Sequence, residues 1–217
     1  MLVMSVSGCV STSEDVKGRP FEFGSLAKTD IDLVTETHQQ IVFVTLKQLA
    51  TKLYKRNPEE WKKEGHESIE AAVSNLSSDP FPAVEGKLSV DCIRLAFDEE
   101  FQGDRVKAFV AGLETMLLEA YGGHKNFYIY HLLEPQKLYN SARNIEVASW
   151  LIRTKYNSEG KLFLLSTADA NNPNLSFERL FGKLINAQDM MAQIVANTTH
   201  REIKNAVQSL ATVFIPL

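Results

Sequence analysis

"TDIDLVTETHQQIVFVTLKQLATKLYKRNPEE" covers residues 29–60, and the spacing of its apolar residues decides the fold class. Thr29 can cap a helix, and Asp32, three residues further on, is the partner that a capping box requires. From there the apolar residues recur with a period close to 3.6, which favours a helix over a strand. The face that we expect to be buried comprises Ile31, Val34, His38, Ile41, Val42, Leu46, Leu49 and Leu53.

The end of this stretch carries a second helix signal. We expect Asn57 to cap a new helix, with Pro58 at its first position. Glu59 and Glu60 suit the positive end of the helix dipole, and Gly65 can end the turn.

Similar helical spacing recurs along the rest of the chain. It predicts helices near residues 67–76, 88–101, 104–121, 135–156, 177–195 and 199–214. Two short segments, 127–133 and 161–166, are aromatic or branched and are either strands or short buried segments. The sequence therefore predicts an all-α, single-domain helical bundle of about seven to nine helices over residues 29–217, with at most minor strand content.

The C-terminal block adds a specific prediction. Thr199 and Glu202 have capping-box spacing, and the residues after them carry an apolar stripe of Val207, Leu210 and Phe214. Such a stripe is expected to dock on an earlier long helix rather than stay exposed.

Composition excludes some functions. Hydrophobic residues make up 44% of the 217 residues and charged residues 23%, as in ordinary globular proteins. The net charge of -4 gives no electrostatic reason to expect nucleic acid as a partner.

Motifs of known chemistry are absent from the sequence. The five histidines do not form an H-E-x-x-H pattern, and there is no G-x-S-x-G or glycine-rich phosphate loop. We predict no catalytic residue, no metal site and no cofactor. His38 is expected to be a hydrogen-bonded core histidine and Cys92 a small buried hydrophobe.

The N-terminal region has a different character. "VSGC", residues 6–9, places an apolar residue and two small residues before Cys9, and a polar stretch with Gly and Pro follows. This pattern resembles the lipobox of bacterial lipoproteins. The resemblance implies that residues 1–8 are the remnant of a signal peptide and that Cys9 carries the lipid. Residues 9–28 would then be a flexible tether, and Val10 after the cysteine points to the outer membrane, facing the periplasm.

One segment has the composition of an interface. Phe127, Tyr128, Tyr130 and His131 follow two glycines, and aromatic side chains with polar tips are favoured where proteins bind one another. Trp61 is a second candidate of this kind. The alternative is that these rings fill the core.

These features predict a lipid-anchored envelope protein whose helical body binds another envelope component as an adaptor or assembly factor. Its partners would be the membrane, through the lipid, and an envelope protein. Two alternatives stay open. A bundle that binds an apolar ligand such as a lipid tail would hold a channel between the 104–121 and 177–195 helices. A hydrolase would hold a His beside Ser, Asp or Glu in a cleft.

Overall fold

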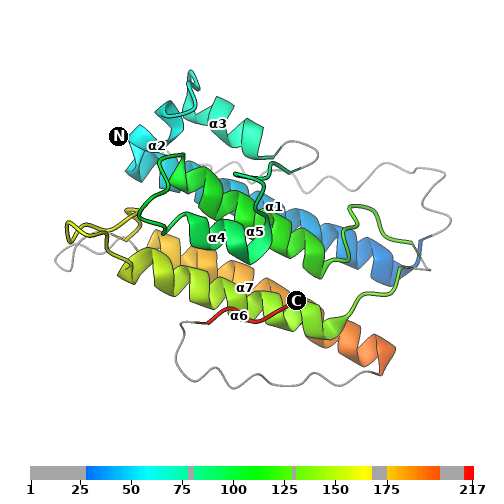
Figure 1. The fold of residues 1–217 in the computed structure, drawn as a ribbon. Helices are drawn as coiled ribbons and strands as arrows, with labels where there is room; N and C mark the ends of the chain where they lie inside the picture. The colour runs from blue at the N-terminus through cyan, green and yellow to red at the C-terminus, as the bar shows by residue number, and fades with distance from the viewer. Residues whose placement is uncertain (1–27, 78–80, 129–130, 168–174, 201–212) are drawn as a thin grey trace, which may run out of the picture.

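The computed structural model describes residues 28–77, 81–128, 131–167, 175–200 and 213–217. These residues form seven helices and no β-strand, which confirms the prediction of an all-α bundle (Figure 1). No described helix is both long and apolar enough to cross a bilayer. The helices are α1 (Asp30–Arg56), α2 (Pro58–Lys62), α3 (Ile69–Leu76), α4 (Ser89–Leu95), α5 (Arg105–Ala120), α6 (Pro135–Thr154) and α7 (Ser176–Thr199).

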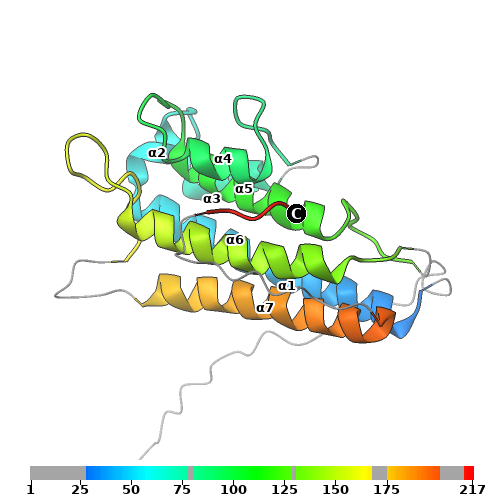
Figure 2. The same ribbon diagram turned by 60° about the horizontal axis from the view of Figure 1, so that its bottom comes forward.

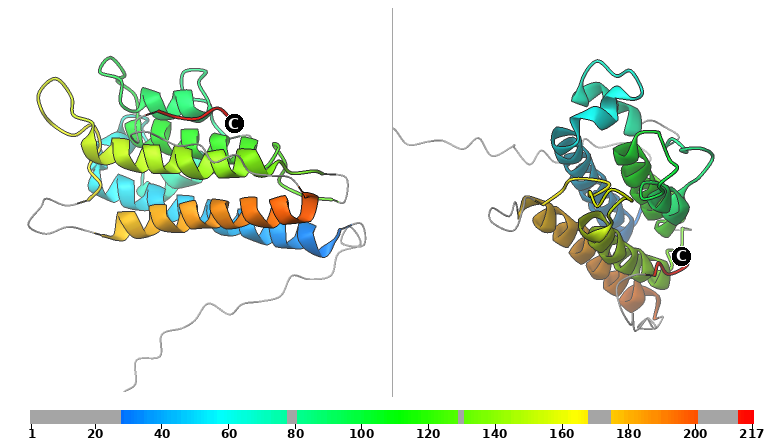
Figure 3. Two further views of the ribbon diagram at one scale, coloured as in Figure 1. Left: turned by 90° about the horizontal axis from the view of Figure 1, so that it is seen from below. Right: turned by 60° about the vertical axis from the view of Figure 1, so that its left-hand side comes forward.

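The four long helices form an up-down-up-down bundle. Helix α1 packs beside α5 and α7, and α6 packs beside the same two helices, so that α1 and α6 lie on opposite sides. The start of α1 and the end of α7 therefore lie at the same end of the bundle (Figure 3). Helix α4 packs on α5, and α3 packs on α1.

Helix α1 begins as the sequence predicts. The amide of Asp32 donates to Thr29 Oγ1 over 3.3 Å, and the Thr29 amide donates to Asp32 Oδ2 over 2.8 Å, which completes the capping box. The predicted buried face is wrong at two positions, because Val34 is 46% and Ile41 58% exposed. Gln39 is buried instead, and its amide donates to the backbone carbonyl of His124.

Asn57 precedes α2, but its side chain does not cap that helix. Its amide nitrogen donates to the carbonyls of Leu53 (2.8 Å) and Leu165 (2.9 Å), and its oxygen accepts the Leu165 N–H (2.7 Å). Asn57 therefore occupies the predicted N-cap position, with Pro58 at the first position of α2, but its side chain makes no capping hydrogen bond. The 161–166 segment has this side chain as a partner, and apart from one isolated bridge between Tyr156 and Leu162 it forms no strand.

Helix α4 ends at Leu95, earlier than predicted, so Phe97 and Phe101 follow it in turns. It lies very close to α5 at Gly112. A Cβ placed there would come within 2.6 Å of the Ile93 backbone nitrogen and 2.8 Å of the Ser89 carbonyl oxygen. Only a residue without a side chain allows this approach.

The C-terminal prediction is tested only at the described ends of the segment. Docking is confirmed for Phe214, which is buried. The helix does not hold at either described end, because residues 213 and 214 are not helical and Thr199 is the last residue of α7, where its hydroxyl donates to the Val195 carbonyl over 2.7 Å. Glu202, Val207 and Leu210 lie outside the described residues. Phe214 is buried, but in an extended tail.

That tail, residues 213–217, runs beside α6 (Figure 2). The Asn144 side chain pairs with Ile215 through two bonds, accepting its N–H over 2.7 Å and donating to its carbonyl over 2.8 Å. Asn140 donates to the Pro216 carbonyl over 2.8 Å, and Arg94 lies 5.4 Å from the centre of the Phe214 ring. Two asparagines of α6 thus replace the strand partner that an extended segment ordinarily has.

We expect Gly112→Ala to destabilise the fold by about 1–3 kcal/mol, because the α4 backbone must move away from the added methyl group. Gly182→Ala in α7 is the matched control, since a Cβ there meets nothing within 4 Å. That change should stabilise the protein by roughly 0.5–1 kcal/mol. Thermal melts of both variants test the prediction, and a neutral Gly112→Ala would contradict the close approach of α4.

We expect Asn144→Ala to cost about 1–3 kcal/mol, because it leaves the N–H and carbonyl of Ile215 without their partner. The Ile215 amide should then exchange with deuterium much faster. Asn197→Ala, on the exposed face of α7, should change stability by less than about 0.5 kcal/mol. Unchanged exchange at Ile215 would show that Asn144 does not hold the tail.

Candidate functional site

The connection between α5 and α6 is held by polar side chains of α1. Glu36, which is buried, accepts the N–H of Phe127 over 2.9 Å and pairs with Lys28. Gln39 donates to the His124 carbonyl over 2.7 Å. Two side chains of α1 therefore hold the backbone of this connection, one at Phe127 and one at His124.

Aromatic rings fill the space under this connection. Phe127 is buried and meets the rings of Tyr121 and His124 edge to face. The imidazoles of His124 and His131 stack, with centroids 3.8 Å apart and planes within 12°. Burial, and then the charge of His131, lower the pKa of His124, which favours the neutral ring in this stack.

Two predicted core residues are confirmed. His38 is buried and shares a 2.8 Å hydrogen bond between its Nδ1 and Tyr121 Oη, and burial lowers its pKa. Cys92 is buried and donates to the Ala108 carbonyl over 3.2 Å, and burial raises the pKa of its thiol to about 11. Neither residue lines the two pockets described below.

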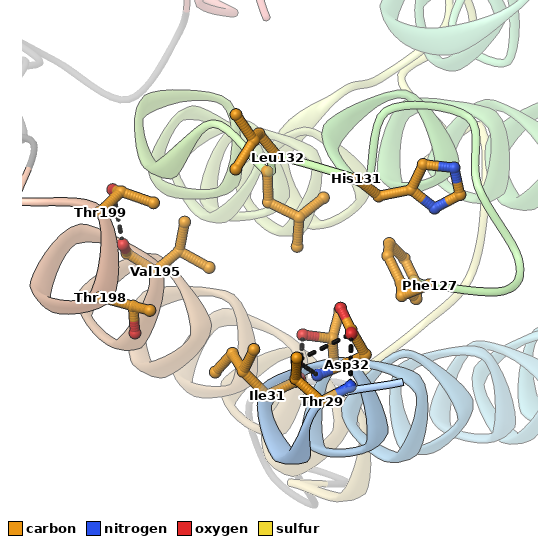
Figure 4. A pocket seen from close by; sticks show the side chains of 11 residues that line it. Thr29, Ile31, Asp32, Phe127, His131, Leu132, Val195, Thr198 and Thr199 are labelled. Carbon is orange, nitrogen blue, oxygen red and sulfur yellow. Dashed lines mark hydrogen bonds between the residues drawn. The ribbon is translucent and has the colours of Figure 1, made fainter. Parts of the chain in front are cut away.

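A pocket of about 370 Å³ opens at this end of the bundle. It lies between the first turns of α1, the α5–α6 connection and the last turns of α7 (Figure 4). We call it the end pocket. Its apolar lining residues are Ile31, Phe127, Leu132, Leu133 and Val195, and its polar lining residues are Thr29, Asp32, Thr35, His131, Thr198 and Thr199.

The polar lining residues are engaged with their own helices. Thr35, Thr198 and Thr199 each donate a hydroxyl proton to the carbonyl four residues earlier, over 2.7–2.8 Å. Their oxygens remain able to accept hydrogen bonds. Asp32 accepts from both the amide and the hydroxyl of Thr29 through Oδ2. The lining therefore suits an apolar group that carries a hydrogen-bond donor at its edge.

The structure brings together only part of the predicted interface. Phe127 and His131 line the end pocket. Tyr128 follows Phe127 in the sequence, and Lys28 Nζ lies 5.2 Å from the centre of the Tyr128 ring. Tyr130 and Cys9 lie outside the described residues.

Trp61 is far from this site. It follows α1, whose 27 residues separate the two ends of the bundle by about 40 Å. Its ring is half-buried and packs against the main core, so it does not share a surface with Phe127.

Sequence reasoning missed most of the pocket lining. Ile31, Leu132 and Val195 come from three separate segments, and no short motif joins them. The one local signal is Leu132-Leu133 directly before the proline that starts α6. This pair precedes the predicted 135–156 helix, so the apolar face of that helix does not account for it.

The space between α5 and α7, where the lipid-binding alternative predicts a channel, contains side chains. The rings of Phe109 and Phe181 meet there edge to face, with centroids 6.4 Å apart. In the described part of the chain, no group of three His, Cys, Asp or Glu residues is placed to hold a metal ion.

Comparison of the chain with protein families, with characterised proteins and with solved structures gives no match.

Proposed function

We propose that the chain is a lipid-anchored bacterial envelope protein whose helical body binds another envelope protein through the end pocket. The observation that carries this proposal is the apolar lining of a pocket that is open to solvent. Leu132 contributes to that lining and is 75% exposed. Large apolar groups that remain exposed around a concavity are typical of interaction sites.

The size of the pocket favours a protruding side chain as its occupant. Sites for small molecules usually enclose roughly 300–1,000 Å³, and the end pocket, at about 370 Å³, lies near the lower limit. One anchor residue of a partner, inserted between Leu132, Phe127 and Val195, would cover this apolar surface. Interfaces generally obtain most of their binding energy from a few such anchors.

The position of the expected tether also favours a binding site at this end of the bundle. Thr29, which lines the end pocket, directly follows the expected tether of residues 9–28. A flexible coil of twenty residues spans about 25 Å on average. A lipid on Cys9 would therefore keep the end pocket close to the membrane surface, where other envelope proteins are anchored.

The two alternatives have less support. The end pocket is open to solvent, whereas a lipid tail needs a cavity that buries most of its surface, and Phe109 and Phe181 occupy the space between α5 and α7. The hydrolase alternative requires a His beside Ser, Asp or Glu in a cleft. The end pocket contains Asp32 and His131, but Asp32 Oδ2 holds the first turn of α1 and the His131 ring stacks on His124.

The anchor is tested by metabolic labelling. We expect an alkyne fatty acid to label the wild-type protein in its native host and not the Cys9→Ser variant, because the acyl chains attach at that cysteine. Gel fluorescence after click chemistry measures the label. Equal labelling of both proteins would contradict the lipid attachment.

The end pocket is tested by photo-crosslinking. A photoreactive amino acid in place of Leu132 should give a discrete protein adduct in host membranes. The matched control is Leu175, which is 65% exposed and directly precedes α7 at the other end of the bundle. No such adduct is expected from that position.

The outcomes distinguish the readings. A protein adduct from position 132 that disappears in the Cys9→Ser background supports both the anchor and the site. Adducts with lipid alone would favour the lipid-binding alternative, and equal yields from positions 132 and 175 would contradict a specific pocket.

A further inference from the structure

Glu114 is an acid in the apolar interior of the bundle. It lies in the middle of α5, and its residue is only 2% exposed. Its Oε2 is buried and has no hydrogen-bond partner in the described part of the chain. A buried polar atom without a partner costs free energy, so the fold alone gives no reason for a carboxyl group at this position.

Glu114 lines a second pocket, of about 440 Å³, which is separate from the end pocket. The side of α1 contributes Gln39 and Phe43, and the segment before α4 contributes Phe81. The rings of Phe43 and Phe81 lie 5.3 Å apart and 30° from parallel. The carboxyl group therefore shares its pocket with two aromatic rings.

The protonation of Glu114 follows from this setting. Burial raises the pKa of Glu114 to about 8, which leaves the side chain mostly protonated at neutral pH. A cation beside it would favour the carboxylate and give it a charge-assisted hydrogen bond, which is stronger than a neutral one.

The aromatic rings are suited to the same kind of ligand. The ammonium group of Lys125, the other charged residue of the lining, lies 4.8 Å from the centre of the Phe81 ring. Aromatic faces attract cations in this geometry, so these rings are able to bind an ammonium group. The Phe43 ring and the Glu114 side chain line the same pocket.

We propose that this pocket binds a small organic ammonium ion, which donates a hydrogen bond to Glu114 and packs its carbon chain against Phe43 and Phe81. A neutral donor would satisfy Oε2 without the gain in charge interaction. A carboxylate ligand would compete with Glu114 for one proton. The site is independent of the end pocket and of the partner proposed there.

Isothermal titration of the protein with butylammonium chloride at pH 7 tests this. Binding should release close to one proton, because the ligand converts a mostly protonated Glu114 into the carboxylate. The proton is measured by repeating the titration in phosphate and in MOPS, whose ionisation enthalpies differ and neither of which is a primary ammonium ion. Butanol and butyrate, with chains of the same length, serve as neutral and anionic probes.

Glu114→Gln should weaken the binding of butylammonium at least tenfold and abolish the proton release. The amide is nearly isosteric and uncharged, so we expect the variant to fold, and a thermal melt checks this. Glu119→Gln, at an exposed position on the same helix, is the matched control and should bind as the wild type does. Phe81→Leu should also weaken binding, because it removes one ring.

Three results would overturn the proposal. The first is butylammonium binding that is undetectable or equally tight in the wild type and Glu114→Gln. The second is tighter binding of butyrate or butanol than of butylammonium. The third is binding without proton release, which would place the ligand away from Glu114.

Discussion

The buried polar side chains of the first half of α1 are the constraint on which the open end of the bundle depends. The described residues of the α5–α6 connection form no helix or strand that would satisfy their backbone, and Glu36 accepts the N–H of Phe127 while Gln39 donates to the carbonyl of His124. Leaving such a group buried without a partner costs about 1–3 kcal/mol. The inner face of α1 is therefore polar at the very place where a bundle helix would ordinarily be apolar.

This polarity also explains why the sequence predicts the buried faces of some helices correctly and that of α1 less well. Apolar spacing predicted the long helices well, because α5, α6 and α7 bury apolar faces. On α1 it misassigned Val34 and Ile41, since polar residues occupied the true inner face. Asn57 occupies the N-cap position of α2 and Thr199 has the residue type of a cap, but their side chains donate to other backbone groups, the carbonyls of Leu165 and Val195. Competition of this kind involves tertiary partners, which a local pattern does not contain.

The candidate site was predictable only where its residues are neighbours in sequence. Phe127 and His131 stand in one aromatic cluster, and both line the end pocket. Ile31 and Val195 join them only because α1 and α7 meet at that end. Glu114 did carry a signal, since it stands between Val110 and Leu117 on the apolar spacing of α5. A charged residue at such a position indicates either a buried partner or a ligand.

The contact between α1 and α7 joins the first and last helices of the described chain. The pairs α4–α5 and α6–α7 are adjacent in sequence and can form early, whereas α1 obtains its final neighbour only once α7 exists. Until α5 and its connection to α6 exist, the inner face of α1 is in water, and Glu36, His38 and Gln39 are well hydrated there. The side chains that later hold the connection thus also keep an unfinished chain from exposing a continuous apolar helix face, the usual cause of association between folding intermediates.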